Sequence, residues 1–208
     1  MATRSRNGIG SLLGILVLAA VAFILLNMFN VVRVGFGKFG CGWEPSIRFG
    51  AMADADADTD DDQCPTSISD AMNDAAWAAD RHATIKYRYI TTGLMYDQDG
   101  IEHEFTSGDE KGADAQRVVA ILRGQNVPPN RAGRYLAASH VEPKVAALMR
   151  ETGIQQGVLV INNRSGPCGP SNEGTSCRDV LPSILSAGST LRVWFADAGG
   201  TMQYRDFP

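Results

Sequence analysis

The residues best suited to chemistry are a histidine and a glutamate two positions apart, followed by two cysteines further along the chain: His140, Glu142, Cys168 and Cys177. One imidazole and two thiolates are suitable zinc ligands, and three protein ligands leave a fourth position for water. Zinc-bound water loses a proton near neutral pH and becomes a nucleophile, and a carboxylate beside it can carry that proton. Taken together, these residues are typical of a catalytic zinc site.

The histidine and the glutamate stand at the beginning of an expected helix. Val145, Leu148 and Met149 have the i, i+3, i+4 spacing of an apolar helical face. Residues two apart do not face each other on a regular helix. We therefore expect His140 and Glu142 to converge at a helix entrance, where the backbone is not yet helical.

Pro143 supports such an entrance. Proline is tolerated in a first helical turn, and it disfavours helical backbone at the residue before it, which is Glu142. The alternative is that Ser139 simply caps the helix, because serine is a common first residue of that kind. Gly153 is expected to end the helix.

Each member of the group also has an ordinary interpretation. A single histidine is most often a surface or core residue, and Glu142 could be a solvated charge at a helix end. Cys168 and Cys177 could form a disulfide in an exported protein. Judged together, in this order and on these expected elements, the residues favour the zinc site.

The elements around this group alternate between short strands and helices. Runs joined at Asp99-Gly100 predict one hairpin, and "TLRVWF" and "TMQYRDF" around Gly199-Gly200 predict another. Between them we expect helices at "GADAQRVVAILRG" and "VEPKVAALM", a strand at "GVLVIN", and a short helix beginning near Cys177. Pro182 would suit that last helix only near its first turn. The predicted order β-β-α-α-β-α-β-β makes an α/β domain, one mixed sheet with helices packed on it.

The stretch from about Thr91 to Phe207 resembles the DddA-like deaminase toxins of bacteria. "HVE" followed by "GPC" and a second cysteine is similar to the H-x-E…P-C-x-x-C signature of zinc-dependent nucleobase deaminases. The narrower resemblance is carried by "TTGLMYDQDG", "ASHVEPKVAALMRETGI", "VLVINNRSGPC" and "LPSILSAGSTLRVWF". It implies a cytidine-deaminase-like fold, with a core at about 91–207 inside a deaminase domain at 66–208.

The resemblance also implies an activity, which is zinc-dependent hydrolytic deamination of cytosine to uracil in DNA. Such toxins act in competing cells and are neutralised by a cognate immunity protein. By motif, His140, Cys168 and Cys177 would bind Zn²⁺, and Glu142 would be the catalytic proton carrier.

Asn162 and Asn163 match the "NN" before the cysteine loop, which resembles a substrate-contacting position, although both could simply be strand-end turn residues. The cysteine spacing departs from the family pattern, because eight residues separate Cys168 from Cys177 where the motif has two. Extra loop length adds little closure entropy. We therefore expect the insertion to alter the rim of the substrate pocket more than the zinc site.

Two other functions fit the sequence. One is a deaminase of another base or of free nucleosides, because the zinc chemistry is shared and the pocket walls select the base. The other is a non-enzymatic, membrane-anchored interaction module, in which the cysteines form a disulfide or a structural zinc site. From Arg81 to Pro208 there are fourteen Lys/Arg and thirteen Asp/Glu. The charge thus neither supports nor excludes a DNA substrate, single- or double-stranded.

Residues 1–34 are expected to form a transmembrane helix. Twenty-six uncharged residues lie between Arg6 and Arg33, and about 20 apolar residues span a bilayer. The alternative is a cleaved signal peptide with a cleavage site at Ala20-Val21-Ala22. We expect a single-pass membrane protein or a secreted one, with the deaminase domain extracytoplasmic until delivery to a target cell. Basic residues on the two sides are nearly balanced, so they do not fix the orientation.

Residues 35–65 are interpreted as a Gly- and Asp-rich linker, with six aspartates between Asp54 and Asp62. Cys41 and Cys64 flank this acidic run and could form a disulfide. The next segment, "SISDAMNDAAWAADRH", predicts one short helix capped by Ser67 or Ser69.

Overall fold

The computed structural model of the protein describes residues 64–169 and 175–208. The expected membrane segment at 1–34, the aspartate run and Cys41 lie outside the described residues. Among the helices that are described, none has the length and apolar character needed to cross a membrane. Cys64 takes part in a disulfide, and its expected pairing with Cys41 stays a prediction.

A five-stranded mixed sheet organises the domain, in the order β2-β1-β3-β4-β5. Its strands are β1 (Thr92–Tyr96), β2 (Glu102–Thr106), β3 (Gln156–Ile161), β4 (Thr190–Ala196) and β5 (Met202–Phe207). β3 and β4 are parallel, whereas the other neighbouring strands are antiparallel. The predicted mixed sheet, with a hairpin at each edge, is confirmed.

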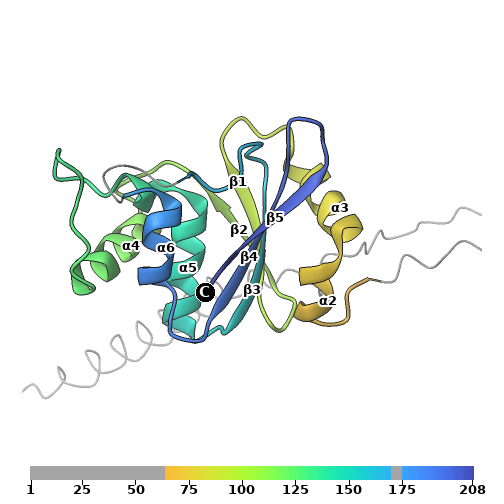
Figure 1. Ribbon diagram of the computed structural model, residues 1–208, viewed down its shortest axis with the longest axis horizontal. Helices are drawn as coiled ribbons and strands as arrows, with labels where there is room; N and C mark the ends of the chain where they lie inside the picture. The colour runs from red at the N-terminus through yellow and green to blue at the C-terminus, as the bar shows by residue number, and fades with distance from the viewer. Residues whose placement is uncertain (1–63, 170–174) are drawn as a thin grey trace, which may run out of the picture. The chain divides into compact units, whose positions relative to one another are not determined.

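Helices cover both faces of this sheet, as Figure 1 shows. One face carries α2 (Ile68–Asn73) and α3 (Ala75–Ile85). The other carries α4 (Ala113–Gly124), α5 (Val141–Thr152) and α6 (Cys177–Ile184), and the short 3-10 helix η2 (Leu136–Ser139) precedes α5. Because both faces are covered, β1 is buried along its whole length, and β3 is buried after its first residue.

The sheet separates two apolar clusters. The larger one lies between the sheet and α4–α6, and it includes Leu159 of β3 and Met149 of α5. The smaller one lies against α2 and α3, and it includes Val160 of β3 and Trp77 of α3. Leu159 and Val160 are adjacent residues that point to opposite faces, as the two-residue period of a strand requires. The sheet against which α5 and α6 pack is therefore held from both sides.

The segment expected to form one helix after Ser67 forms two. Ser67 caps α2, as predicted, but Asp74 accepts a hydrogen bond from the Trp77 amide at 2.9 Å and begins α3. A capping residue has extended rather than helical backbone. Asp74 therefore ends the first helix by starting the second.

Two prolines behave differently from the predictions. Pro182 is the sixth residue of α6 instead of lying in its first turn, and the helix ends two residues later, as expected when a helical hydrogen bond is missing. Pro143 does lie in the first turn of α5, but Glu142 before it is already helical. The buried packing of that turn thus outweighs the steric preference of the residue before proline.

Candidate active site

His140 is the N-cap residue of α5. Its backbone is extended (φ −83°, ψ 158°), and its side chain makes no capping hydrogen bond. Ser139, the alternative cap, instead donates its hydroxyl to the Leu136 carbonyl at 3.0 Å. The helix therefore begins without the serine cap that the ordinary explanation required, and the imidazole is directed to other partners.

Those partners are brought together by the start of α6, which begins at Cys177 as predicted. Ser176 and Asp179 form a capping box, in which each side chain accepts a hydrogen bond from the backbone amide of the other. The Cys177 amide, at the end of this cap, donates to Cys168 Sγ at 2.8 Å. The helix start thus joins the two cysteines despite the long insertion between them.

The ligand atoms of His140, Cys168 and Cys177 all lie within 4.8 Å of one another. His140 Nδ1 is 3.0 Å from Cys177 Sγ and 3.6 Å from Cys168 Sγ. Nitrogen and sulfur ligands of one tetrahedral zinc stand about 3.6 Å apart, from Zn–N of about 2.0 Å and Zn–S of about 2.3 Å. Both cysteines are free thiols. The donor types and their spacing therefore fit zinc, after a small opening of the His140–Cys177 contact.

Hydrogen bonds within this group set its protonation. Hydrogen bonding to Cys177 lowers the pKa of the Cys168 thiol well below its usual range, and the same interaction raises the pKa of Cys177. Hydrogen bonding to Cys168 raises the pKa of His140. The arrangement favours a thiolate at Cys168, where the backbone amide at the start of α6 stabilises negative charge.

Glu142 lies beside the ligand group, in the first turn of α5, and is only 2% exposed. Its Oε2 accepts a hydrogen bond from Cys177 Sγ at 3.7 Å. Burial raises the pKa of the carboxyl, because desolvation disfavours its charged form. A carboxyl with a raised pKa is a stronger base than an ordinary carboxylate, which suits it to take up a proton and then return it.

The comparison with known families agrees with this geometry. The family model of the SCP1.201-like deaminases matches residues 61–207 of the chain. This chain belongs to that family. No curated protein matches it. The SCP1.201-like deaminase assignment makes the chain a hydrolytic enzyme, and it confirms the resemblance seen in the sequence at the level of a deaminase.

The structure of this SCP1.201-like deaminase also identifies a positioning residue that the motif does not contain. A Cβ atom built on Gly93 in β1 would lie 2.6 Å from Val141 Cγ1 and 2.7 Å from Leu159 Cδ1. Val141 stands between His140 and Glu142, so the active turn of α5 rests directly on the backbone of β1. The signal available in the sequence was a glycine inside a predicted strand, which often marks a close backbone approach.

Lys144 ties the same turn to the loop after β2. It is buried, and its Nζ donates to the carbonyls of Thr106 at 2.8 Å and Gly108 at 3.0 Å. The Gly108 amide in turn donates to the Ser139 carbonyl at 2.9 Å. Desolvation lowers the pKa of Lys144. A lysine in a helix is usually solvated, so sequence reasoning missed this contact.

Asn162 follows β3, and its amide group is occupied by backbone. Its Oδ1 accepts from the Thr92 amide at 2.8 Å. Its Nδ2 lies 3.1 to 3.2 Å from three carbonyl oxygens, those of Ile85, Arg88 and Ile90. In this arrangement Asn162 holds the loop between α3 and β1.

Asn163 forms a turn. Its Nδ2 donates to the Gly166 carbonyl at 2.8 Å, and its Oδ1 accepts from the Ser165 amide at 3.2 Å. Such local bonds are typical of the turn residues that were the alternative interpretation. The expected contact of Asn162 and Asn163 with substrate stays a prediction.

Proposed function

We propose that this deaminase hydrolyses cytosine to uracil in DNA with zinc as its cofactor. The observation that carries the proposal is the buried Glu142 carboxyl beside the His140, Cys168 and Cys177 group. A His/Cys/Cys ligand set with a non-ligand glutamate is the equipment of zinc nucleobase deaminases, which attack C4 of cytosine. The narrower resemblance to DddA-like toxins supports DNA as the substrate.

Zinc held by the two thiolates and the imidazole would supply Lewis acidity to a bound water. The protein residues then manage protons and position. Glu142 accepts the proton of the attacking water and passes protons to ring atom N3 and to the departing amine, so that cytosine and water become uracil and ammonia. Because Glu142 is buried, these transfers take place away from bulk water.

The biological setting follows the same resemblance. We propose an antibacterial toxin that enters competing cells and meets a cognate immunity protein in cells that produce it. Residues 1–34 would hold it in the membrane or direct its export, with the deaminase domain extracytoplasmic until delivery.

The decisive assay incubates the zinc-loaded full chain with single-stranded and duplex oligonucleotides that carry one cytosine. Uracil appearing at that position, at a rate proportional to enzyme, is the expected result. Matched oligonucleotides with adenine or guanine at the same position, and free cytidine, serve as competing substrates. Faster conversion of one of these would replace cytosine in DNA as the substrate, and conversion of none would contradict the proposed chemistry.

A further inference from the structure

The loop between α3 and β1, residues 86–90 ("KYRYI"), exposes an unusual set of side chains; we call it the basic–aromatic loop. Tyr87 is 88% exposed, and Tyr89 is fully exposed. Ile90 is exposed as well, so this one loop holds half of the six exposed large apolar side chains among the described residues. Apolar groups gathered at one place on a surface commonly mark a binding site.

The same loop is positively charged in a protein whose formal net charge is −4. Lys86 and Arg88 belong to it, and no carboxylate occurs between Asp80 and Asp97 in the sequence. Arg88 lies 4.0 Å from Glu104, but both side chains are about half exposed, and such a pair contributes little. The local charge therefore favours an anionic partner.

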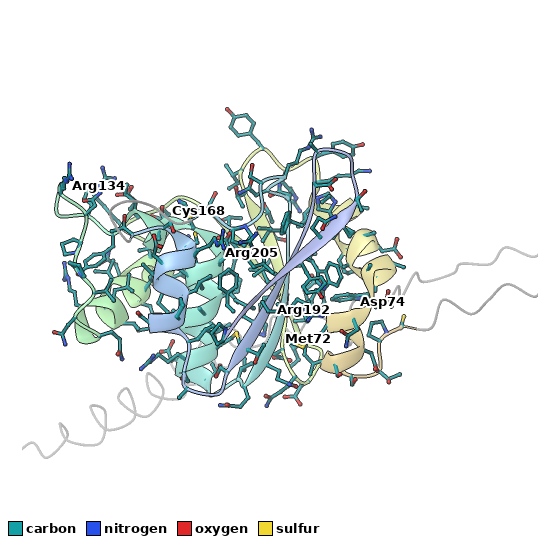
Figure 2. The ribbon with its side chains drawn as sticks, in the orientation of Figure 1. Met72, Asp74, Arg134, Cys168, Arg192 and Arg205 are labelled. Atoms are coloured by element: carbon teal, nitrogen blue, oxygen red, sulfur yellow. The ribbon has the colours of Figure 1, made fainter. Side chains whose placement is uncertain are left out.

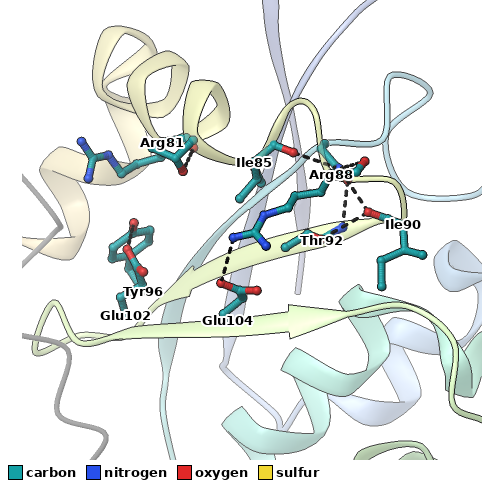
Figure 3. A network of polar contacts seen from close by, with 10 residues as sticks. Arg81, Ile85, Arg88, Ile90, Thr92, Tyr96, Glu102 and Glu104 are labelled. Carbon is teal, nitrogen blue, oxygen red and sulfur yellow. Dashed lines mark hydrogen bonds and ion pairs between the residues drawn. The ribbon is translucent and has the colours of Figure 1, made fainter.

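Asn162 fixes the shape of this loop. Figure 3 shows the backbone groups of Ile85, Arg88, Ile90 and Thr92 directed toward one point. The Asn162 side chain forms hydrogen bonds with all four of these backbone groups. A loop held in this way loses less conformational entropy when a ligand binds. Its exposed rings are thus presented on an ordered backbone.

The loop lies at one end of β1, the second strand of the sheet. It leads into Thr92, and the next residue, Gly93, contacts Val141 at the start of α5. Thr91 also accepts a hydrogen bond from the Ser107 amide at 2.8 Å, and Ser107 adjoins the segment bound by Lys144. The loop and the candidate active site therefore share one end of the sheet.

A cavity of about 460 Å³ opens beside the loop on the α3 side of the sheet. Lys86, Tyr87 and Asn162 line it, together with His82 of α3 and Arg164 of the segment after β3. Arg164 is exposed, and no ion pair of Lys86 or Arg164 with another described residue is formed. The cavity therefore adds a further cation to the same surface, and one carboxylate, that of Asp197, also lines it.

We propose that the basic–aromatic loop and Arg164 bind the nucleotides that flank the target base in a single strand of nucleic acid. Tyr87 and Tyr89 stack on unpaired bases, while Lys86, Arg88 and Arg164 pair with phosphates. Aromatic rings interleaved with cations bind single strands in this way without reading a particular sequence. The inference rests on the proposed function, and it specifies the form of the substrate.

Binding is measured with the zinc-loaded full chain carrying Glu142→Gln, which prevents turnover, and a fluorescent single-stranded oligonucleotide containing cytosine. Tyr87→Ala and Tyr89→Ala should each raise Kd about tenfold, from the loss of one stacked base. Tyr89→Phe keeps the ring and should stay within about twofold. Arg88→Ala should weaken binding and lower the salt dependence by about one phosphate contact. The matched control is Arg123→Ala, which removes an exposed arginine at the C-terminal end of α4. It should change neither the Kd nor the salt dependence of binding.

Kinetics of the active enzyme, in which Glu142 is unmodified, separate binding from chemistry. In this active enzyme, Tyr89→Ala should raise KM for the oligonucleotide more than it lowers kcat. The inference is overturned if the folded tyrosine variants bind single strands like the parent, or if duplex binds more tightly with no dependence on the tyrosines. If the tyrosine variants lose binding to a protein partner but still bind single strands like the parent, the inference is likewise overturned. If the parent enzyme forms no uracil on any oligonucleotide, the proposed function fails instead, which distinguishes the two failures.

Discussion

Gly93 of β1 and Val141 of α5 are in such close contact that the glycine leaves no space for a methyl group. The distance from an added Cβ to Val141 Cγ1 would be 2.6 Å. Since His140 and Glu142 are the neighbours of Val141, the sheet sets the position of the proposed zinc ligand and of the proposed proton carrier through one contact. Figure 2 shows Cys168 on the same side of the sheet as α5 and α6, opposite Met72 and Asp74.

Gly93→Ala should therefore impair the site as well as the core. We expect a loss of about 1–3 kcal/mol in the free energy of unfolding, together with weaker zinc binding, because the turn of α5 must move. Denaturant unfolding and zinc titration measure the two effects. Gly124→Ala in α4 is the control, since nothing lies within 4 Å of an added Cβ there. Equal tolerance of both substitutions would show that the contact does not position the site.

The cap of α6 should matter to the metal. Ser176→Ala removes the capping box in front of Cys177 and should lower stability by about 1 kcal/mol. It should also weaken zinc binding, because the same turn presents the amide that binds Cys168. Ser67→Ala removes the corresponding cap of α2, which lies on the opposite face of the sheet from α5 and α6. That control should match the stability loss without affecting zinc, and a similar zinc loss in both variants would contradict the idea.

The buried Lys144 ammonium is expected to stabilise the fold through its hydrogen bonds to backbone carbonyls. Lys144→Met leaves the carbonyls of Thr106 and Gly108 without their cationic partner, and we expect a loss of about 1–3 kcal/mol. Lys111→Met, at an exposed position, should be nearly neutral. Thermal or denaturant unfolding of the two variants provides the test, and a stable Lys144→Met protein would refute the assignment.

Tyr96 should make the protein sensitive to alkali. Burial raises the pKa of its hydroxyl, which donates to Glu102 (Figure 3). In the unfolded chain a tyrosine ionises at about pH 10. The stability contributed by the neutral hydroxyl is therefore complete below about pH 10 and is lost as the pH rises further, because only the unfolded state ionises. In Tyr96→Phe, Tm should therefore fall less steeply above that pH than in the unmodified protein. Tyr204 is half exposed, and Tyr204→Phe should leave the steepness of this fall unchanged.

Much of this architecture follows from local sequence signals. The strands, both hairpins, the start of α6 at Cys177 and the end of α5 at Gly153 were predictable because apolar periodicity and turn residues act locally. The split at Asp74 was not, since aspartate inside a helical pattern and aspartate as a cap look alike in the sequence. Pro182 in the body of α6 depends on how much packing offsets a lost hydrogen bond, which only the tertiary structure decides.

The candidate site shows the same division. The chemistry of His140, Glu142 and the two cysteines is visible from residue types and order. Gly93 and Lys144 were missed because each acts through a partner that is distant in the sequence, 48 positions for Gly93 and Val141 and 38 for Lys144 and Thr106. Backbone packing and burial, which create these contacts, leave little trace in a local pattern.

The most direct test of the account compares Glu142→Ala with the unmodified chain in uracil formation, with zinc content measured on the same samples. Glu142 lies beside the ligand group and is not one of its members. We predict that the variant keeps its fold and about one zinc per chain, while turnover falls at least 10²–10⁴-fold, as for the loss of a general acid–base group. His140→Ala should lose zinc and activity together. A zinc-loaded Glu142→Ala protein that still converts cytosine to uracil at nearly the unmodified rate would contradict the mechanism.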